Sequence, residues 1–192
     1  MTMSNYPNGF FLVFFIRGVP LLQMHPGKVF WVNNSTVLAP GALAGSNGND
    51  GTFTKPFSTI DYAIGRCTAG RGDIICVMPS HAETLTAASG IDLDVSGVAV
   101  VGLGRGTIRP TINITNTAGF VDFSAANCSW INILVTGGVD VIVKAFQMDA
   151  TDCYLELNYR DVTGQATDCV ITTANASRSV IYVNDYDGDT AA

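Results

Sequence analysis

Two aspartates, Asp92 and Asp94, stand two positions apart in the segment IDLD and could form a carboxylate pair. In an extended strand, side chains two positions apart lie on the same face. Two carboxyl groups on one face can hydrolyse a glycosidic bond, but that chemistry also needs a long sugar groove and a general acid whose pKa is raised. The spacing supplies only the pair, so it does not by itself predict a glycosidase.

The histidine of the segment HAETL, His81, lies two positions before Glu83 and could act as a general base. Nucleophilic catalysis also needs a Ser or Cys held by supporting residues, and the spacing shows none. Glu156, the other glutamate of the chain, lies between Leu155 and Leu157 on an alternating pattern and is expected to face solvent. We therefore predict no catalytic residue and a protein that is not an enzyme.

Three glycines in VVGLGRG (100–106) have the spacing of a phosphate-binding loop. A dinucleotide fingerprint requires the third glycine to open a helix. Residues 107–115 are instead rich in β-branched side chains and contain Pro110, so we predict a corner between strands and no cofactor. The segment Arg71-Gly72-Asp73 matches a cell-adhesion tripeptide, but a turn that opens the next strand suffices to explain it.

The aspartates of NDYDGDT (184–190) resemble the first half of a calcium-binding loop. The EF-hand pattern has Gly at its sixth position and Glu at its end. Thr190 occupies the sixth position counted from Asp185, so we predict an acidic tail and no metal site.

The composition limits the classes of function. The 192 residues suffice for one domain with a sizeable core, and 47% of them are hydrophobic while 14% are charged. The net charge is −6 and no block of Lys or Arg occurs, so nucleic-acid binding is not expected. The seven apolar residues 10–16 are too few to span a membrane. The five cysteines show no metal-ligand spacing and are expected to be reduced thiols.

A short helix is predicted near residues 59–67. Ser58 stands three residues before Asp61, which is the capping-box spacing that marks a helix start. Apolar residues then recur with helical spacing, at Ile60, Ala63, Ile64 and Cys67. This apolar stripe must cover another apolar surface.

A repeat of about 25 residues follows the helix. Apolar runs of strand length begin 24, 31, 24 and 26 positions apart, at Ile74, Val98, Ser129, Cys153 and Ser179. Two or three short strands in each period are typical of a β-solenoid, in which each coil buries its inward residues against the next. We predict about five coils of parallel strands between residues 72 and 185. An antiparallel sandwich also has short, evenly spaced strands, but the helix and the lack of Asn-Gly hairpin turns among the repeats of the body favour the solenoid.

Residues 1–46 are predicted to form an extended arm and residues 47–192 the β-helix body. The arm holds four of the seven prolines and five of the ten phenylalanines. Exposed apolar side chains usually mark an interaction surface, and the arm offers Phe10, Phe11, Phe14, Phe15 and Trp31. The alternative is that the Phe-rich run is an edge strand folded back on the body.

The segments DGT, KPFSTIDYAI and GRGDIICVMPSHAETL resemble the N-terminal cap and first coil of right-handed parallel β-helix proteins. This pectin-lyase-like fold is common in bacteriophage tailspikes and head proteins. Residues 17–34 resemble the arm region of phage β-helix proteins. The resemblance implies an all-β, right-handed parallel β-helix whose open end is plugged by the amphipathic helix.

Among such proteins the chain is most similar to a phage head decoration, or cement, protein. That resemblance implies a structural virion protein that is made in the host cytoplasm and stabilises the capsid. Its partners would be the major capsid protein and two further copies in a homotrimer. The alternative is a tailspike or fibre that binds or cleaves host polysaccharide, although tailspike bodies are usually much longer stacks.

Overall fold

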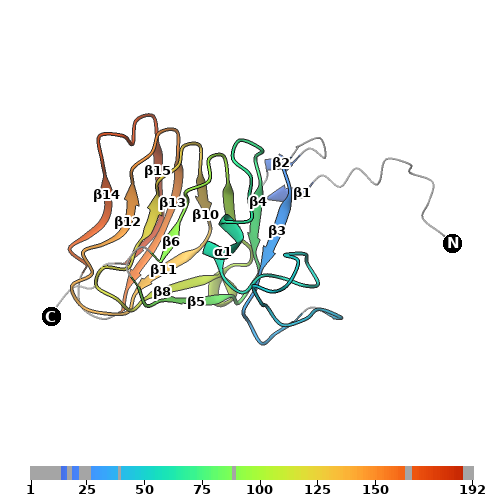
Figure 1. Cartoon of the computed structure of the whole chain (residues 1–192). Helices are drawn as coiled ribbons and strands as arrows, with labels where there is room; N and C mark the ends of the chain where they lie inside the picture. Colours follow the sequence, from blue (N-terminus) through green and yellow to red (C-terminus); the bar gives the residue numbers. More distant parts are fainter. Residues whose placement is uncertain are drawn as a thin grey trace.

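The computed structural model describes residues 14–16, 19–21, 27–38, 40–87, 90–162 and 166–187. From residue 29 onward the chain winds into a right-handed parallel β-helix, which confirms the predicted fold class (Figure 1). One short helix lies at the end of the stack where the first coil begins. Within the described residues no helix is long and apolar enough to cross a membrane.

The strands of the first coils are Val29–Val32 (β3), Ile74–Val77 (β4), Ala82–Leu85 (β5), Ile91–Asp92 (β6), Ala99–Gly102 (β7), Thr111–Ile114 (β8) and Val121–Phe123 (β9). The strands of the later coils are Ser129–Ile131 (β10), Leu134–Gly137 (β11), Lys144–Met148 (β12), Tyr154–Asp161 (β13), Asp168–Thr172 (β14) and Val180–Asp187 (β15). The remaining elements are the strands Phe14–Ile16 (β1) and Val19–Leu21 (β2), the helix Ile60–Ile64 (α1) and the 3-10 turn Gly106–Ile108 (η1).

Each turn of the β-helix contributes to three walls. The first wall contains β3, β4, β7 and β10, the second contains β5, β8 and β11, and the third contains β6, β9, β12 and β14. The eight-residue strand β13 pairs with β10 through its first half and with β11 through its second, so the first two walls form one continuous sheet. Four complete turns result, with β3 and β15 added at the two ends, where the sequence predicted about five coils.

The register between turns stacks like positions on one another. Ile74 pairs with Ala99, Ala99 with Ser129, Ser129 with Tyr154, and Tyr154 with Val180. These residues are 25, 30, 25 and 26 positions apart, close to the predicted period, and the spacing explains why the apolar runs could be aligned.

The core of the β-helix consists of columns of inward-facing side chains. On the first wall Val100, Trp130 and Leu155 lie at paired positions and are fully buried. On the second wall, by contrast, a column of apolar residues ends at a carboxylate in the first coil: the stacked residues are Glu83, Ile112, Val135 and Tyr159. An inward-facing Glu needs polar partners, and these partners form the candidate site described below.

The same left-handed backbone turn opens every coil. The residue two positions before the first-wall strand has a φ between 58° and 80° in each turn, at Gly72, Gly97, Asn127, Asp152 and Arg178. Backbone hydrogen bonds join successive corners, from Gly97 N–H to Ala126 and from Asn127 N–H to Thr151. Gly and Asn tolerate this conformation at little cost. Arg178 is instead held by two hydrogen bonds from its guanidinium to Asp152, at 2.8 and 2.5 Å.

The corner between the first and second walls varies in length. Equivalent positions on the two walls are eight residues apart in the first coil (Ile74 and Ala82), twelve in the second (Ala99 and Thr111) and five in the third (Ser129 and Leu134). The long corner of the second coil contains η1 and corresponds to the glycine-rich segment, as predicted. Asn132 closes the short corner by donating from its side-chain amide to the carbonyls of Gly102 and Gly104.

Helix α1 packs on the open end of the first coil. Its inward residues Ile60, Ala63 and Ile64 are at most 1% exposed. The helix is shorter than predicted, and the predicted capping box is wrong. Thr59 is the N-cap and makes no side-chain capping bond, while the Ser58 hydroxyl donates to Asn47 Oδ1 at 2.9 Å.

Candidate functional site

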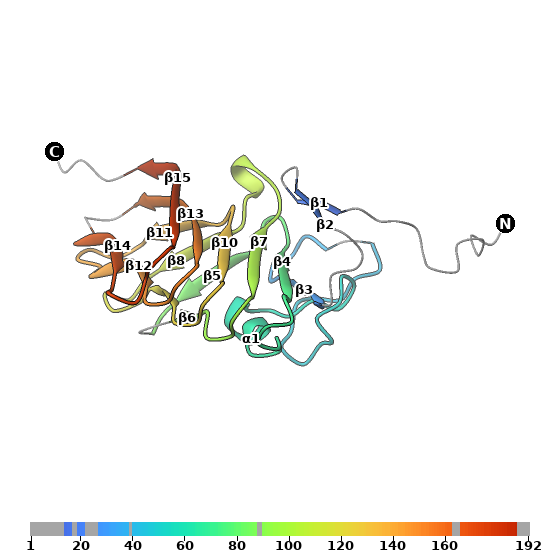
Figure 2. The ribbon, with the colours of Figure 1, turned by 90° about the horizontal axis from the view of Figure 1, so that it is seen from above.

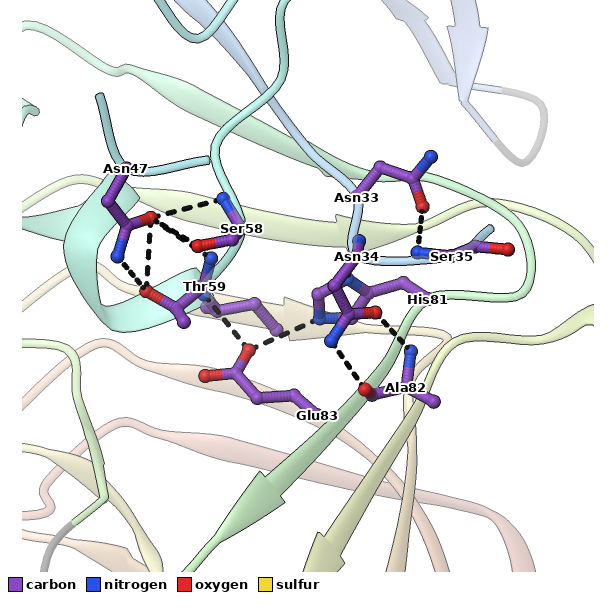
Figure 3. Close-up of polar contacts among 10 residues, drawn as sticks. Asn33, Asn34, Ser35, Asn47, Ser58, Thr59, His81, Ala82 and Glu83 are labelled. Carbon is purple, nitrogen blue, oxygen red and sulfur yellow. Dashed lines mark hydrogen bonds and ion pairs between the residues drawn. The ribbon is translucent and has the colours of Figure 1, made fainter. Parts of the chain in front are cut away.

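A buried polar cluster joins the start of α1 to the first coil (Figure 3). Glu83 Oε2 accepts a hydrogen bond from the Ile60 backbone N–H at 3.0 Å and lies 3.2 Å from His81 Nε2. The Asn34 backbone N–H donates to His81 Nδ1 at 3.1 Å. Because Nδ1 accepts, the ring carries its proton on Nε2 and donates it to Glu83. Both ring nitrogens are therefore engaged.

Asparagines complete this cluster from the chain segments that precede the helix. The Asn34 side chain accepts from Ala82 N–H at 2.8 Å and donates to Ala82 C=O at 2.5 Å, so it pairs with β5 as a neighbouring strand would. Asn47 Oδ1 accepts from the backbone N–H groups of Ser58 and Thr59, at 3.1 and 3.3 Å. The cluster therefore ties α1 and the segment after β3 to the first coil.

The burial of the cluster decides its role. His81 is 1% exposed and Glu83 is 9% exposed, and both ring nitrogens of His81 and the Oε2 atom of Glu83 are already hydrogen-bonded within the protein. The carboxylate lies at the start of a helix, where backbone N–H groups lack intrahelical partners and negative charge is favoured. The geometry makes Glu83 the anchor of the helix and His81 its positioning partner. The hypothetical base beside Glu83 is thus a structural group.

A second polar cluster lies on the outer face of the third wall. Asp92 on β6 pairs in register with Asp122 on β9. The Ser124 hydroxyl donates to Asp92 Oδ1 at 2.5 Å, and the Asp92 backbone N–H donates to Asp61 Oδ1 of α1 at 3.2 Å. We call Asp61, Asp92 and Asp122 the carboxylate row.

Two members of the carboxylate row, Asp122 and Asp61, have a raised pKa. Partial burial raises the pKa of Asp122, and the charges of Asp92 and Asp149 raise it further, although Lys144 opposes them. Partial burial also raises the pKa of Asp61, which is the more exposed of the two. A carboxyl group with a raised pKa can donate a proton or a hydrogen bond to a ligand oxygen.

The carboxylate row differs from the pair of Asp92 and Asp94 that the sequence suggested. Asp94 is exposed and takes no part in the hydrogen bonds of Asp92 that are described above. The neighbour of Asp92 is Asp122, thirty positions later. The sequence repeat could have predicted this pairing. The segments IDL (91–93) and VDF (121–123) place an aspartate between apolar residues at the same position of successive coils.

Other predicted features are structural. Asp73 is fully buried and accepts from the Arg71 guanidinium at 2.7 and 2.6 Å, so the tripeptide is a turn, as predicted. Glu156 is 3% exposed, which contradicts the predicted solvent-facing position. The reason is its place on β13, which has β10 and β15 on its two sides in the sheet. No group of three or more potential metal ligands occurs in the part of the chain that the structure describes.

The proposed interaction residues of the arm are described only in part. Phe10 and Phe11 lie outside the described residues, and Phe14 and Phe15 belong to β1, whose backbone pairs with β2 in a hairpin. Trp31 lies on β3 and packs edge-on against Phe53, with ring centroids 5.0 Å apart. Trp31 therefore belongs to the body.

Comparisons with known proteins support the fold. No protein family and no curated protein matches the chain. A solved structure of a rhamnogalacturonan lyase superposes with a TM-score of 0.56 at 17% sequence identity. The match covers 74% of this chain and 38% of the lyase chain. At this identity the similarity shows the β-helix fold alone.

Proposed function

We propose that the chain is a structural virion protein, which decorates and stabilises a bacteriophage capsid. The N-terminal arm would bind the major capsid protein, and the β-helix body would assemble with other copies. The proposal rests on the resemblance of the cap and first coil to phage head proteins, and one structural observation carries it further. The strand β3 lies within the segment predicted as the arm (1–46), but it belongs to the body, because it pairs along its whole length with β4, from Val29 with Ile74 to Val32 with Val77. The arm that precedes this attachment is therefore residues 1–28.

The pairing of β3 with β4 supports a role for the arm in attaching the β-helix body to the capsid. A force on the arm is transmitted directly to the hydrogen bonds of the first wall, at the end of the stack that α1 covers (Figure 1). The Phe-rich run precedes this attachment point in the sequence. Each large apolar side chain that becomes buried contributes about 1.5–3 kcal/mol before ordering costs, so four phenylalanines suffice for a stable contact.

The outer face of the first wall supports side-by-side assembly into a homotrimer. It carries an apolar cluster of Ile74, Cys76 and Val101, and Trp31 and Ile131 pack against it while remaining partly exposed. Apolar side chains on the outer face of a wall lie outside the core, so a neighbouring copy could cover them.

A second candidate function is a tailspike or fibre that binds or cleaves host polysaccharide. The carboxylate row favours it, because Asp122 combines a raised pKa with a second carboxyl group at the neighbouring position of the same wall. Glycosidic cleavage uses two carboxyl groups, one of which is a general acid with a raised pKa.

Co-sedimentation with undecorated capsids tests the two functions. Replacing Phe10, Phe11, Phe14 and Phe15 by Ser is expected to weaken capsid binding by roughly tenfold or more, since tenfold corresponds to about 1.4 kcal/mol. The control Val162→Ser, at a position 63% exposed on the body, should bind as the unaltered protein does. A reducing-sugar assay on host polysaccharide runs beside it. Capsid binding that survives the quadruple change would contradict attachment through the arm. Failure of the unaltered protein to bind capsids, together with sugar release that Asp122→Asn abolishes, would contradict the structural role and favour the second candidate.

A further inference from the structure

The outer faces of the three walls differ in chemistry. The stacked outward residues of the second and third walls are polar and partly or fully exposed. They are Thr84, Asn113 and Thr136 on the second wall and Asp92, Asp122 and Gln147 on the third. The outward residues of the first wall include an apolar cluster that is only 3–7% exposed, at Ile74, Cys76 and Val101. An apolar outer face is a place where another segment can pack.

The surroundings of Cys76 show that water is largely excluded from the middle of this face. Its neighbours in register are Trp31 on β3 and Val101 on β7. Burial raises the pKa of the Cys76 thiol to about 11, although outward positions on the other two walls reach solvent. The margin of the face toward the first coil remains open, since Val29 is 46% and Phe53 is 45% exposed. A segment that covered the face would bury this margin as well.

The hairpin of β1 and β2 has the chemistry to cover this face. All six residues of its two strands, 14–16 and 19–21, are apolar. Its backbone pairs Phe14 with Leu21 and Ile16 with Val19. An isolated two-stranded hairpin is marginally stable at best in water, so this one needs an apolar surface against which to pack.

The hairpin is also within reach of the first wall. Eight positions separate Leu21 from Val29, so the connection spans at most about 28 Å. The strands β3, β4, β7 and β10 carry the face, and at about 4.8 Å between neighbours they cover about 14 Å. Figure 1 and Figure 2 both show β1 and β2 beside β3 and β4, at the margin that is still open.

We propose that the β1–β2 hairpin packs on the outer face of the first wall of its own chain in the free protein. The connection begins at Val29, which lies on that face, so no second copy is needed to bring the two together. This docking is the folded-back arm that the sequence left open as an alternative. It does not rest on the capsid role, because Phe10 and Phe11 precede the hairpin.

The docking has a consequence for assembly. The outer face of the first wall is also the face proposed above to meet neighbouring copies. A docked hairpin and a neighbouring copy cannot occupy it together, so the hairpin must leave before copies pack side by side.

The alkylation rate of Cys76 in the native, full-length protein tests the docking. Ile16→Asp together with Val19→Asp places two carboxylates at paired positions of the hairpin, where like charges are destabilising. We expect alkylation of Cys76 to become about tenfold faster or more, a factor that corresponds to about 1.4 kcal/mol of lost contact. The matched control, Phe10→Asp together with Phe11→Asp, makes the same change before the hairpin and should leave the rate unaltered.

Two further measurements make the result specific. Cys128 and Cys153 face the core, so their slow alkylation reports that the body is folded. If they also react faster in the Asp variant, Ile16→Ser together with Val19→Ser repeats the test without added charge. Dilution distinguishes the hairpin of the same chain from a second copy, because protection of Cys76 within one chain does not depend on protein concentration.

Three results would overturn the proposal. The first is alkylation of Cys76 in the unaltered protein as fast as in denatured protein, which would mean that the face is open. The second is protection of Cys76 that is lost on dilution, which would assign the cover to a second copy. The third is an unchanged Cys76 rate in the hairpin variants. None of these measurements involves capsids, so they stand apart from the test of capsid binding.

Discussion

The Glu83 carboxylate accepts a hydrogen bond from the Ile60 backbone N–H across 23 positions of sequence. A residue of the second wall thus caps the helix that closes the stack. Glu83 ends the apolar column of the second wall, and its carboxylate gains hydrogen-bond donors from the start of α1. The helix in turn gains an acceptor for a backbone N–H that has no partner within the helix. The cap and the first coil are therefore expected to unfold together.

Removing this carboxylate should loosen the cap. Glu83→Ala leaves the Ile60 N–H and the His81 ring proton without an acceptor inside the protein, and we expect it to lower the free energy of unfolding by about 2 kcal/mol. Glu83→Gln retains an acceptor oxygen and should cost less than half as much. Urea denaturation of the two variants measures the difference, and equal losses would show that Glu83 does not cap α1.

The buried face of α1 gives a second test. Ile60→Asp together with Ile64→Asp places two carboxylates against the core, and we expect a loss of several kcal/mol with exposure of the first coil. The control Tyr62→Asp changes an outward residue of the same helix and should have a much smaller effect. Thermal unfolding and light scattering measure both consequences. A double variant that melts as the unaltered protein does, without aggregation, would show that α1 is not a cap.

Asp73 is expected to make stability depend on pH. Burial acts to raise its pKa, but hydrogen bonds from Arg71 and from the backbone of Thr68 and Lys28 outweigh it, and the pKa is lowered. Its contribution to stability is therefore complete above the unfolded-state pKa of about 3.9 and is lost as the pH falls below that value.

Asp73→Asn tests this dependence. It should lower the free energy of unfolding by about 3 kcal/mol near pH 7, because it leaves the Arg71 charge without its partner. The difference between variant and unaltered protein should shrink below pH 4. A difference that is constant from pH 3 to 7 would exclude a titrating Asp73.

Asp122 is expected to make stability depend on pH in the opposite direction to Asp73. Its pKa is raised, so its charged form is disfavoured in the folded protein, and it weakens the fold increasingly as the pH rises above about 3.9. Asp122→Asn should raise the free energy of unfolding at pH 7 by at most about 1 kcal/mol, since solvent screens a partly exposed charge, and should change it little at pH 3. The exposed Asp94→Asn serves as the control. A loss of stability in Asp122→Asn at pH 7 would contradict the raised pKa.

The five cysteines are free thiols, as the sequence predicted. Burial raises the pKa of Cys76 and Cys128 to about 11 and that of Cys67 and Cys169 to about 12. Little thiolate exists at pH 8, so alkylation of the native protein should be slow, and all five should react after denaturation. Mass spectrometry of native and denatured samples provides the measurement. Residues still unmodified after denaturation would indicate disulfides.

The helix and the coil period could be predicted because each depends on the spacing of nearby apolar residues. The capping of α1 could not, because Ser58 and Asp61 have the right spacing while the actual acceptor, Glu83, comes from a later strand. The carboxylate row was missed for a related reason. Asp92 and Asp122 are neighbours only in the exact register between coils, and the spacing of the apolar runs does not fix that register to one residue.

The corner between the first and second walls has a practical consequence for engineering. It spans twelve positions in the second coil and five in the third, yet the strands on either side keep their register. Foreign peptides can therefore be displayed there, after the exposed Gly106. Doubling the length of such a loop costs only about 0.6 kcal/mol in closure entropy. In the proposed capsid role, each β-helix would then present one epitope at a fixed height and orientation on the particle.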